Sequence, residues 1–299
     1  MRNSMLIEVR APFDLGLSLR AAAAFAPVPP GEEERLRLPL RLGERLLLAE
    51  ARQVGRRPAR LEISCPACRP GGRDMKEVVE RTCRAVSAGL DLRPFYRMTA
   101  GHPVMARVAG RLRGLKPLRP PELFDMAVIA VTEQQISLHA AYRVRTRFLQ
   151  LFGTEVDGVT AFPSPRELAG RTVEELRACG LSGRKARYLL ELARGIVEGR
   201  VDLDELENMD DRQAREYLTS LRGFGLWTAE YIMVRGLGRT DVVPADDLGI
   251  RSLVGLYLGD GSRMTAEEAR RALAPFAPWR GLAAFYLLAY HRLLGPDAP

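Results

Sequence analysis

The sequence predicts an α+β fold, in which a small N-terminal antiparallel sheet with helices precedes an all-α domain. Before residue 100, short or alternating apolar runs are broken by proline and glycine, which is typical of strands and turns. From about Pro103 onward the apolar spacing is helical and strand signals are nearly absent. A length of 299 residues suggests two domains of about 150 residues each. We therefore expect domains at 1–102 and 103–299.

The N-terminal domain should contain two helices among its strands. Apolar runs at Leu36–Leu48 and Arg60–Ser64 predict strands, and Pro27–Glu34 predicts a loop. An alanine-rich helix is expected at Leu15–Phe25. A second helix is expected at Asp74–Ser87, where apolar residues recur at helical spacing. Strands combined with two helices predict a small α+β layer.

The second domain should hold about eight short helices. Glu122–Phe152 predicts two helices that are broken near Gln134–Ser137. Ser164 followed by Pro165 predicts an N-cap with proline at the first helical position. Thr172-x-x-Glu175 and Thr265-x-x-Glu268 are capping boxes that predict two further helix starts. Ser182 precedes a helix that should end near Gly199, and Asp210 precedes one that should end near Ser220.

Composition and charge indicate a soluble protein with a polyanionic partner. The chain is 46% hydrophobic and 27% charged, which excludes a disordered or collagen-like protein. No apolar run approaches the ~18 residues of a membrane span. Acidic residues by position 14 exclude a signal peptide, so we expect a cytoplasmic location. The net charge of +8 points to nucleic acid as the partner. All basic residues except Lys76, Lys116 and Lys185 are arginine, a preference that a GC-rich genome would explain without any function.

The four cysteines imply no disulfide framework. Cys65-Pro-Ala-Cys68 has the spacing of half a zinc site or of a redox pair, but a structural zinc site needs four ligands. Cys83 and His102 follow only at a distance, and Cys179 is remote. We therefore predict no metal and interpret the pair as a turn that carries two thiols, whose role stays open.

The most informative segment is Leu221-Arg-Gly-Phe-Gly-Leu-Trp-Thr-Ala229. A helix ends there, Gly223 and Gly225 bracket one apolar residue, and a new helix starts at once. Such a hairpin points backbone N–H groups outward at a helix N-terminus, which forms an anion site for a DNA phosphate. Phe224 should anchor the hairpin in the core, and Arg222 is a candidate DNA contact. An ordinary tight connection between two helices is the alternative interpretation.

Two carboxylates stand directly before the next apolar helix, within Thr240-Asp-Val-Val-Pro-Ala-Asp-Asp-Leu-Gly-Ile-Arg251. The second, Asp247, follows Trp227 by 20 residues. A helix–hairpin–helix followed at this distance by an aspartate at a helix start resembles the DNA glycosylase superfamily that is named for those two features. The segments Ile129–Ser137, Phe162–Gly199 and Pro278–Arg280 also resemble that superfamily, and the region before residue 100, with Pro12-Phe-Asp14, resembles the extra domain of the 3-methyladenine DNA glycosylase II (AlkA) type.

The resemblance implies a monofunctional DNA glycosylase of base excision repair. Such an enzyme flips alkylated purines of the 3-methyladenine type out of duplex DNA and hydrolyses their glycosidic bond to leave an abasic site. Asp247 matches the catalytic position, where a carboxylate stabilises an oxocarbenium-like transition state, and Asp246 is expected to cap the helix. The alternatives are that Asp246 is the catalytic carboxylate, or that both aspartates only cap the helix. Branches that also cut the strand carry a lysine where this chain has Trp227, so no lyase activity is expected. The iron–sulfur branch of the family needs four cysteines near the C-terminus, and no cysteine follows Cys179, so this branch is excluded. The resemblance implies no cofactor, although members of the family hold a monovalent cation at the hairpin.

The resemblance also implies a base pocket. Trp227 and Tyr231 lie one helical turn apart at pocket positions, where an electron-rich face selects cationic alkylated bases, with core packing as the alternative. Leu248 and Leu288 occupy positions where the family often has aromatic residues. Tyr286 or Tyr290 is a candidate to replace those aromatics, and an early pocket phenylalanine falls on Ala21.

The residue that fills the gap left by a flipped base is expected at Gln135, with Gln134 beside it. The AlkA type usually has an apolar wedge, so this wedge would be polar. Alternatively, both glutamines merely cap a helix break. Arg251 is, like Arg222, a candidate for the nonspecific, salt-sensitive DNA contact.

Two other functions stay open: the same fold acting on deaminated or oxidised purines, and a damaged-DNA-binding protein without catalysis. Asp247 argues against the non-catalytic binder, because a carboxylate near the phosphates repels DNA and is useful there only if it takes part in the reaction. The expected partner is double-stranded DNA containing damaged bases, with no membrane partner. We expect a monomer that is cytoplasmic and associated with the nucleoid.

Overall fold

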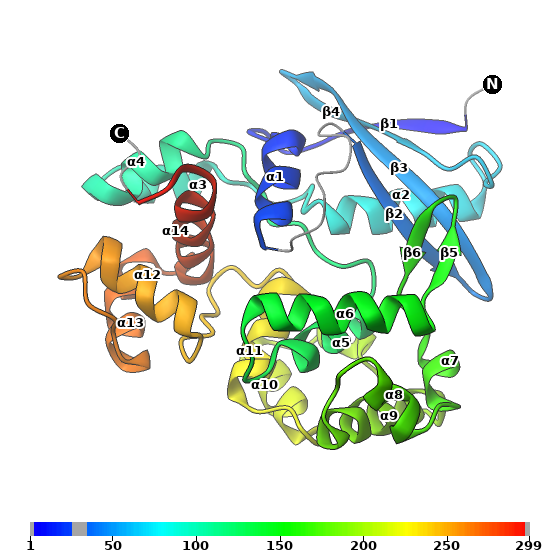
Figure 1. The fold of residues 1–299 in the computed structure, drawn as a ribbon. Coiled ribbons are helices and arrows are strands. Elements are labelled where there is room, and N and C mark those ends of the chain that lie inside the picture. Colours follow the sequence, from blue (N-terminus) through cyan, green and yellow to red (C-terminus); the bar gives the residue numbers. More distant parts are fainter. Residues whose placement is uncertain (1–2, 26–34, 297–299) are drawn as a thin grey trace. The chain divides into compact units, whose positions relative to one another are not determined.

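The computed structural model describes residues 3–25 and 35–296, and it confirms the α+β fold (Figure 1). The loop expected at Pro27–Glu34 lies outside the described residues. The chain divides into two compact units. The first unit comprises Met1–Leu38, Ala49–Arg119 and Gly238–Pro299, and the second comprises Pro39–Leu48 and Pro120–Leu237.

The larger sheet has the strand order β1-β4-β3-β2. Its strand β4 (Ala59–Ser64) pairs antiparallel with β1 (Ser4–Glu8) and with β3 (Arg45–Arg56). Every second residue of β4 is buried, as in a sheet with one covered face. The apolar run expected as strand from residue 36 forms both β2 (Arg35–Leu42) and β3, because Gly43 turns the chain with a φ of +60°.

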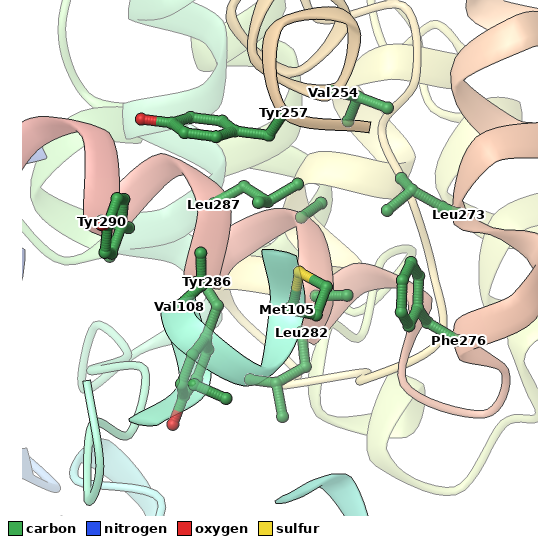
Figure 2. Packing of buried hydrophobic residues seen from close by; sticks show 14 of the residues in the cluster. Met105, Val108, Val254, Tyr257, Leu273, Phe276, Leu282, Tyr286, Leu287 and Tyr290 are labelled. Atoms are coloured by element: carbon green, nitrogen blue, oxygen red, sulfur yellow. The ribbon is translucent and has the colours of Figure 1, made fainter. Parts of the chain in front are cut away.

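The helices of the first unit pack around α14 (Arg280–Leu294). This helix contacts α1 (Leu15–Phe25), α4 (Pro103–Arg111) and α12 (Leu248–Leu258). Figure 2 shows the buried apolar cluster that these helices share, with Tyr286 among its members. The predicted N-terminal helices are confirmed, α1 with its predicted bounds and α2 within about two residues of them. The other elements of the unit are α2 (Arg73–Ala85), α3 (Arg93–Thr99), α13 (Ala266–Leu273) and the 3₁₀ helix η2 (Ala274–Phe276).

Apart from the turn between β2 and β3 and the adjoining strand residues, the second unit is helical except for one short hairpin. α5 (Leu123–Glu133) and α6 (Leu138–Phe152) confirm the predicted break between two helices. After α6, β5 (Thr154–Val156) and β6 (Val159–Ala161) form a two-stranded sheet, so the expectation of an all-α second domain is wrong at this point. Strands of three residues are too short to show the alternation that identifies a strand. The remaining helices are α7 (Pro165–Ala169), α8 (Val173–Ala178), α9 (Gly183–Val197), η1 (Asp204–Glu207), α10 (Asp211–Ser220) and α11 (Leu226–Arg235).

The predicted helix starts are confirmed because their signals are local. Ser164, Thr172 and Thr265 each form a capping box with the glutamate three residues later. Ser182 and Asp210 also cap their helices through side-chain oxygens. The helices α4 to α14 outnumber the about eight expected.

The compact units are not divided at residue 102. The C-terminal helix α14 packs on α1 and α4, so both ends of the chain contribute to the first unit. The division into sequence domains at 1–102 and 103–299 stays a prediction about which parts fold independently.

Candidate functional site

The hairpin between α10 and α11 has the tight turn expected from its glycines. Gly223 has a φ of +88°, a conformation that favours glycine. A Cβ atom built on Gly223 would lie 2.2 Å from Cδ2 of Tyr188, whose ring packs directly against the turn. Gly225 has a φ of −83°, and nothing would lie within 4 Å of an added Cβ. The turn therefore requires glycine at 223, whereas Gly225 leaves the surface beside it open.

The hairpin presents groups that can hold an anion. Phe224 is buried, and its N–H donates to the carbonyl oxygen of Leu221 at 3.1 Å, which confirms that it anchors the turn in the core. Gly225 is the N-cap of α11 and supplies no side-chain cap, so the first N–H groups of α11 lack helical partners at the positive end of the helix dipole. Arg222 is 68% exposed and pairs with Glu191 at 2.7 Å. Backbone N–H groups beside an exposed guanidinium are the chemistry that binds a phosphate.

Gln134 ties the loop between α5 and α6 to this hairpin. Its Nε2 donates to the carbonyl oxygen of Gly223 at 2.9 Å and to Oγ1 of Thr228 at 3.0 Å. Lys185 Nζ donates to the carbonyl oxygens of Gln134 at 2.7 Å and of Thr132 at 3.1 Å. Burial lowers the pKa of Lys185. The Gln134 side chain therefore supports the hairpin.

Gln135 occupies the apex of the same loop. It is exposed and has a φ of +55°, an uncommon conformation for a residue other than glycine. Ile136, which follows it, is 41% exposed. Such strained, exposed positions gather at ligand-contacting loops, and the wedge role of Gln135 stays a prediction.

Trp227 and Tyr231 form a stacked pair on α11. Their ring centroids are 5.0 Å apart and the planes differ by 12°. The Tyr231 hydroxyl donates to Oε2 of Glu133 at 2.7 Å, and Oε1 of Glu133 accepts from Nη1 of Arg145 at 2.6 Å. One turn further along α11, Cζ of Arg235 lies 5.7 Å from the Tyr231 ring centroid. The structure thus brings the two predicted aromatic residues together and adds three charged neighbours that sequence reasoning missed.

Asp247 begins α12 as its N-cap. Its Oδ1 accepts from the N–H of Gly249 at 2.8 Å and from the N–H of Ile250 at 3.1 Å. The expectation that Asp246 caps this helix is wrong: Asp246 is exposed in the preceding turn, one residue too early to reach these N–H groups. The two hydrogen bonds hold the Asp247 carboxylate at the positive end of α12.

The segment that leads to Asp247 is clamped by Arg280. The Nε of Arg280 donates to Oδ1 of Asp241 at 2.8 Å, and its Nη2 donates to Oδ2 at 2.5 Å. This guanidinium lowers the pKa of Asp241. Gly281 packs closely against the backbone of Val242: a Cβ atom built on Gly281 would lie 2.1 Å from the Val242 carbonyl oxygen. The start of α14 therefore fixes the approach to α12, a role that the sequence did not reveal.

Leu248 and Leu288 lie close to Asp247 in the first unit. Leu248 follows it directly and is 58% exposed. A Cβ atom built on Gly249 would lie 3.1 Å from Oδ1 of Asp247 and 3.9 Å from Cδ2 of Leu288. Both leucines predicted for the pocket are thus near the carboxylate.

Tyr286 and Tyr290 do not replace the absent aromatic residues. Both are fully buried in the core (Figure 2). The Tyr286 hydroxyl donates to the carbonyl oxygen of Leu115 at 2.7 Å, and burial raises its pKa well above the usual value. The expectation that one of them lines a pocket is wrong, because this face of α14 packs into the core. Ala21 is buried in the same cluster.

Two remaining expectations concern Arg251 and the paired cysteines. Nε of Arg251 donates to the carbonyl oxygen of Met264 at 2.7 Å, so this side chain supports the loop after α12. Cys65 and Cys68 are buried, and the N–H of Cys68 donates to the carbonyl oxygen of Cys65 at 3.1 Å, which confirms the turn. Among the described residues, no group of three or more potential metal ligands occurs. Within those same residues, every helix is too short or too polar to cross a membrane.

Comparison with known proteins identifies the same segment. A family model described as "HhH-GPD superfamily base excision DNA repair protein" matches residues 128–278, which include the hairpin, the aromatic pair and Asp247. The DNA-3-methyladenine glycosylase of Bacillus subtilis (strain 168) is 29% identical over 201 residues, which are 66% of this chain and 66% of that protein.

Two solved structures are similar in fold and in sequence. The 3-methyladenine DNA-glycosylase from Archaeoglobus fulgidus has a TM-score of 0.83 at 27% identity and covers 96% of this chain and 98% of its own. The 3-methyladenine DNA glycosylase of Schizosaccharomyces pombe in complex with abasic DNA has a TM-score of 0.59 at 29% identity, over 67% of this chain and 97% of its own. The chain spans between 58% and 66% of the length of the first curated relatives that it matches.

Proposed function

This chain belongs to the HhH-GPD superfamily of base excision DNA repair proteins, and we propose that it is a monofunctional DNA glycosylase acting on alkylated purines of the 3-methyladenine type. The observation that carries the proposal is the Asp247 carboxylate, fixed by two N–H groups at the start of α12. The names of the similar bacterial and archaeal proteins support the lesion class.

The reaction is a hydrolysis at C1′ of the damaged nucleotide. The base leaves with the electrons of the glycosidic bond, and positive charge develops on the sugar. The Asp247 carboxylate stabilises that charge and orients the attacking water, which adds to C1′ and gives its proton to this carboxylate. Removing one electrostatic stabiliser of this kind costs about 10²- to 10³-fold in rate. The product is an abasic site in an intact strand.

The lysines give the reason for expecting no lyase step. Schiff-base chemistry needs an amine beside the sugar, and the first turn of α11 has Trp227 instead. Lys116 is buried, and its Nζ donates to the carbonyl oxygens of Arg10 and Ala88. Lys185 is engaged with the carbonyl oxygens at the end of α5, and Lys76 lies on α2.

DNA is bound mainly through its phosphates. The N–H groups at the start of α11 and the Arg222 guanidinium contact the backbone without reading sequence, so affinity falls as salt rises. Gln135, at the exposed apex after α5, enters the gap left by the flipped base. The protein works as a monomer on double-stranded DNA.

The test compares base release from methylated duplex DNA by the wild-type protein, Asp247→Asn and Asp246→Asn. Asparagine caps a helix about as well as aspartate, so Asp247→Asn keeps the fold and loses only the charge. We expect it to lose at least about 10²-fold in rate while it retains DNA affinity. Asp246→Asn is the matched control, since this neighbour is exposed and should keep full activity.

Two outcomes would contradict the proposal. Base release by Asp247→Asn at the wild-type rate would remove Asp247 from the chemistry. A wild-type protein that binds but releases nothing from methylated DNA would exclude alkylated purines, and duplexes with deaminated or oxidised purines would then separate another lesion from a non-catalytic binder. Covalent trapping by borohydride would show a lyase step.

A further inference from the structure

A desolvated ion pair lies beside the aromatic pair and has no part in the mechanism above. Glu133, the last residue of α5, accepts hydrogen bonds from Tyr231 and from Arg145 on separate oxygens. The side chains of Glu133 and Arg145 are each only 11% exposed. Solvent therefore screens their charges weakly, and the field of Glu133 reaches the stacked rings.

Two further charged groups near these rings, Arg235 and Lys185, are cationic. Arg235 lies beside Tyr231, with Nη1 3.5 Å from the hydroxyl. Lys185 donates to the carbonyl oxygens of the residues on either side of Glu133. Arg145 adds a third positive charge, so Glu133 provides the negative charge in direct contact with Tyr231. Removing it would leave these three positive charges without that carboxylate and would disfavour a cation at the rings.

We propose that Glu133 is a specificity residue that lets the Trp227–Tyr231 pair accept a positively charged base, by supplying the counter-charge to Arg145, Arg235 and Lys185. The inference rests on the proposed function and deepens it, because it separates cationic N-alkylated purines from neutral lesions. The attraction between a ring face and a cation is electrostatic and depends on the local field. A unit charge about 10 Å away, at an effective dielectric constant of about 20, changes cation affinity by roughly tenfold.

The experiment measures binding without bond cleavage, so that it does not depend on Asp247. The chain has two tryptophans, Trp227 and Trp279, and Trp279→Phe leaves Trp227 as the reporter. In this background, fluorescence quenching is titrated with 3,9-dimethyladeninium, a cation, and with neutral 9-methyladenine. We expect the unmodified site to prefer the cation, and Glu133→Gln to weaken cation binding about tenfold while changing neutral binding less than about twofold.

The matched control removes a positive charge together with Glu133. The double variant Glu133→Gln/Arg145→Met restores the original charge balance and should recover most of the cation affinity. Arg145→Met alone should strengthen cation binding, and this variant decides the question if Glu133→Gln does not fold. Base release from duplexes carrying 7-methylguanine or hypoxanthine should show the same selectivity in rate.

Several results would overturn the proposal. Equal losses for the cation and the neutral base would mean that Glu133 only positions Tyr231, as would a double variant that stays as weak as Glu133→Gln. Weaker cation binding by Arg145→Met, or no preference for the cation in the parent protein, would also exclude it. A protein that binds the cation selectively but releases no base would refute the proposed reaction and leave this inference standing.

Discussion

Replacing Gly223 by alanine should destabilise the second unit by about 2–5 kcal/mol. The φ of +88° costs a residue with a Cβ about 1–2 kcal/mol. The added methyl would also lie 2.2, 2.3 and 2.6 Å from three atoms of the Tyr188 ring, so the ring or the turn must move. Such overpacking typically costs about 1–3 kcal/mol. Urea unfolding followed by circular dichroism measures the change in the free energy of unfolding.

Two further variants separate these contributions. Gly225→Ser is the matched control, because its Cβ meets open space and serine caps a helix better than glycine, so its stability should stay within about 0.5 kcal/mol. In a Tyr188→Ala background, Gly223→Ala should cost only the backbone part, about 1–2 kcal/mol. A Gly223→Ala protein as stable as the wild type, or an equal loss in Gly225→Ser, would refute this account of the turn.

Three other predictions concern the first unit. In urea unfolding, Asp247→Ala should lose about 1 kcal/mol of stability because the helix cap is lost, whereas Asp247→Asn should keep the wild-type stability. Burial lowers the pKa of Lys116 to about 8, against about 10.4 in an unfolded chain. Between pH of about 8 and about 10.4 the unfolded state binds more protons than the folded state, so the free energy of unfolding should rise with pH over this range, by up to about 3 kcal/mol. Urea titrations at several pH values measure this rise, which should be absent in Lys116→Met. Asp241→Asn should lower the free energy of unfolding by about 1–3 kcal/mol in urea unfolding, because it disrupts the two hydrogen bonds that Arg280 donates to the Asp241 carboxylate. An unchanged urea midpoint would show that this pair is not needed for stability.

Features encoded by a few neighbouring residues were predictable from the sequence. The capping boxes at Thr172 and Thr265, and the break between α5 and α6, depend on signals within about one helical turn. The hairpin around Gly223 was found for the same reason. The strands β5 and β6 were missed because three residues carry too little pattern.

Features that depend on distant contacts were not predictable. Tyr188 packs against a turn 35 residues later, and Tyr231 meets Glu133 across 98 residues. The one available signal was a carboxylate at the C-terminal end of the mostly apolar helix α5. Residue type alone makes Tyr286 or Tyr290 a candidate for the pocket, and only the packing of α14 shows that both belong to the core.

The cap of α12 shows why one assumption about Asp246 and Asp247 failed. The sequence interpretation gives the cap to Asp246 and the reaction to Asp247, which assumes that one carboxylate cannot do both. In the structure the cap falls on Asp247, and both N–H groups bind a single oxygen, Oδ1. Capping fixes the orientation of the carboxylate without removing its charge, so a catalytic carboxylate gains by serving as the cap. Asparagine and alanine at position 247 therefore probe different properties: both should slow base release by at least about 10²-fold, and only alanine should lower stability. Equal stability of the two variants would mean that the cap contributes nothing and that the carboxylate is held in some other way.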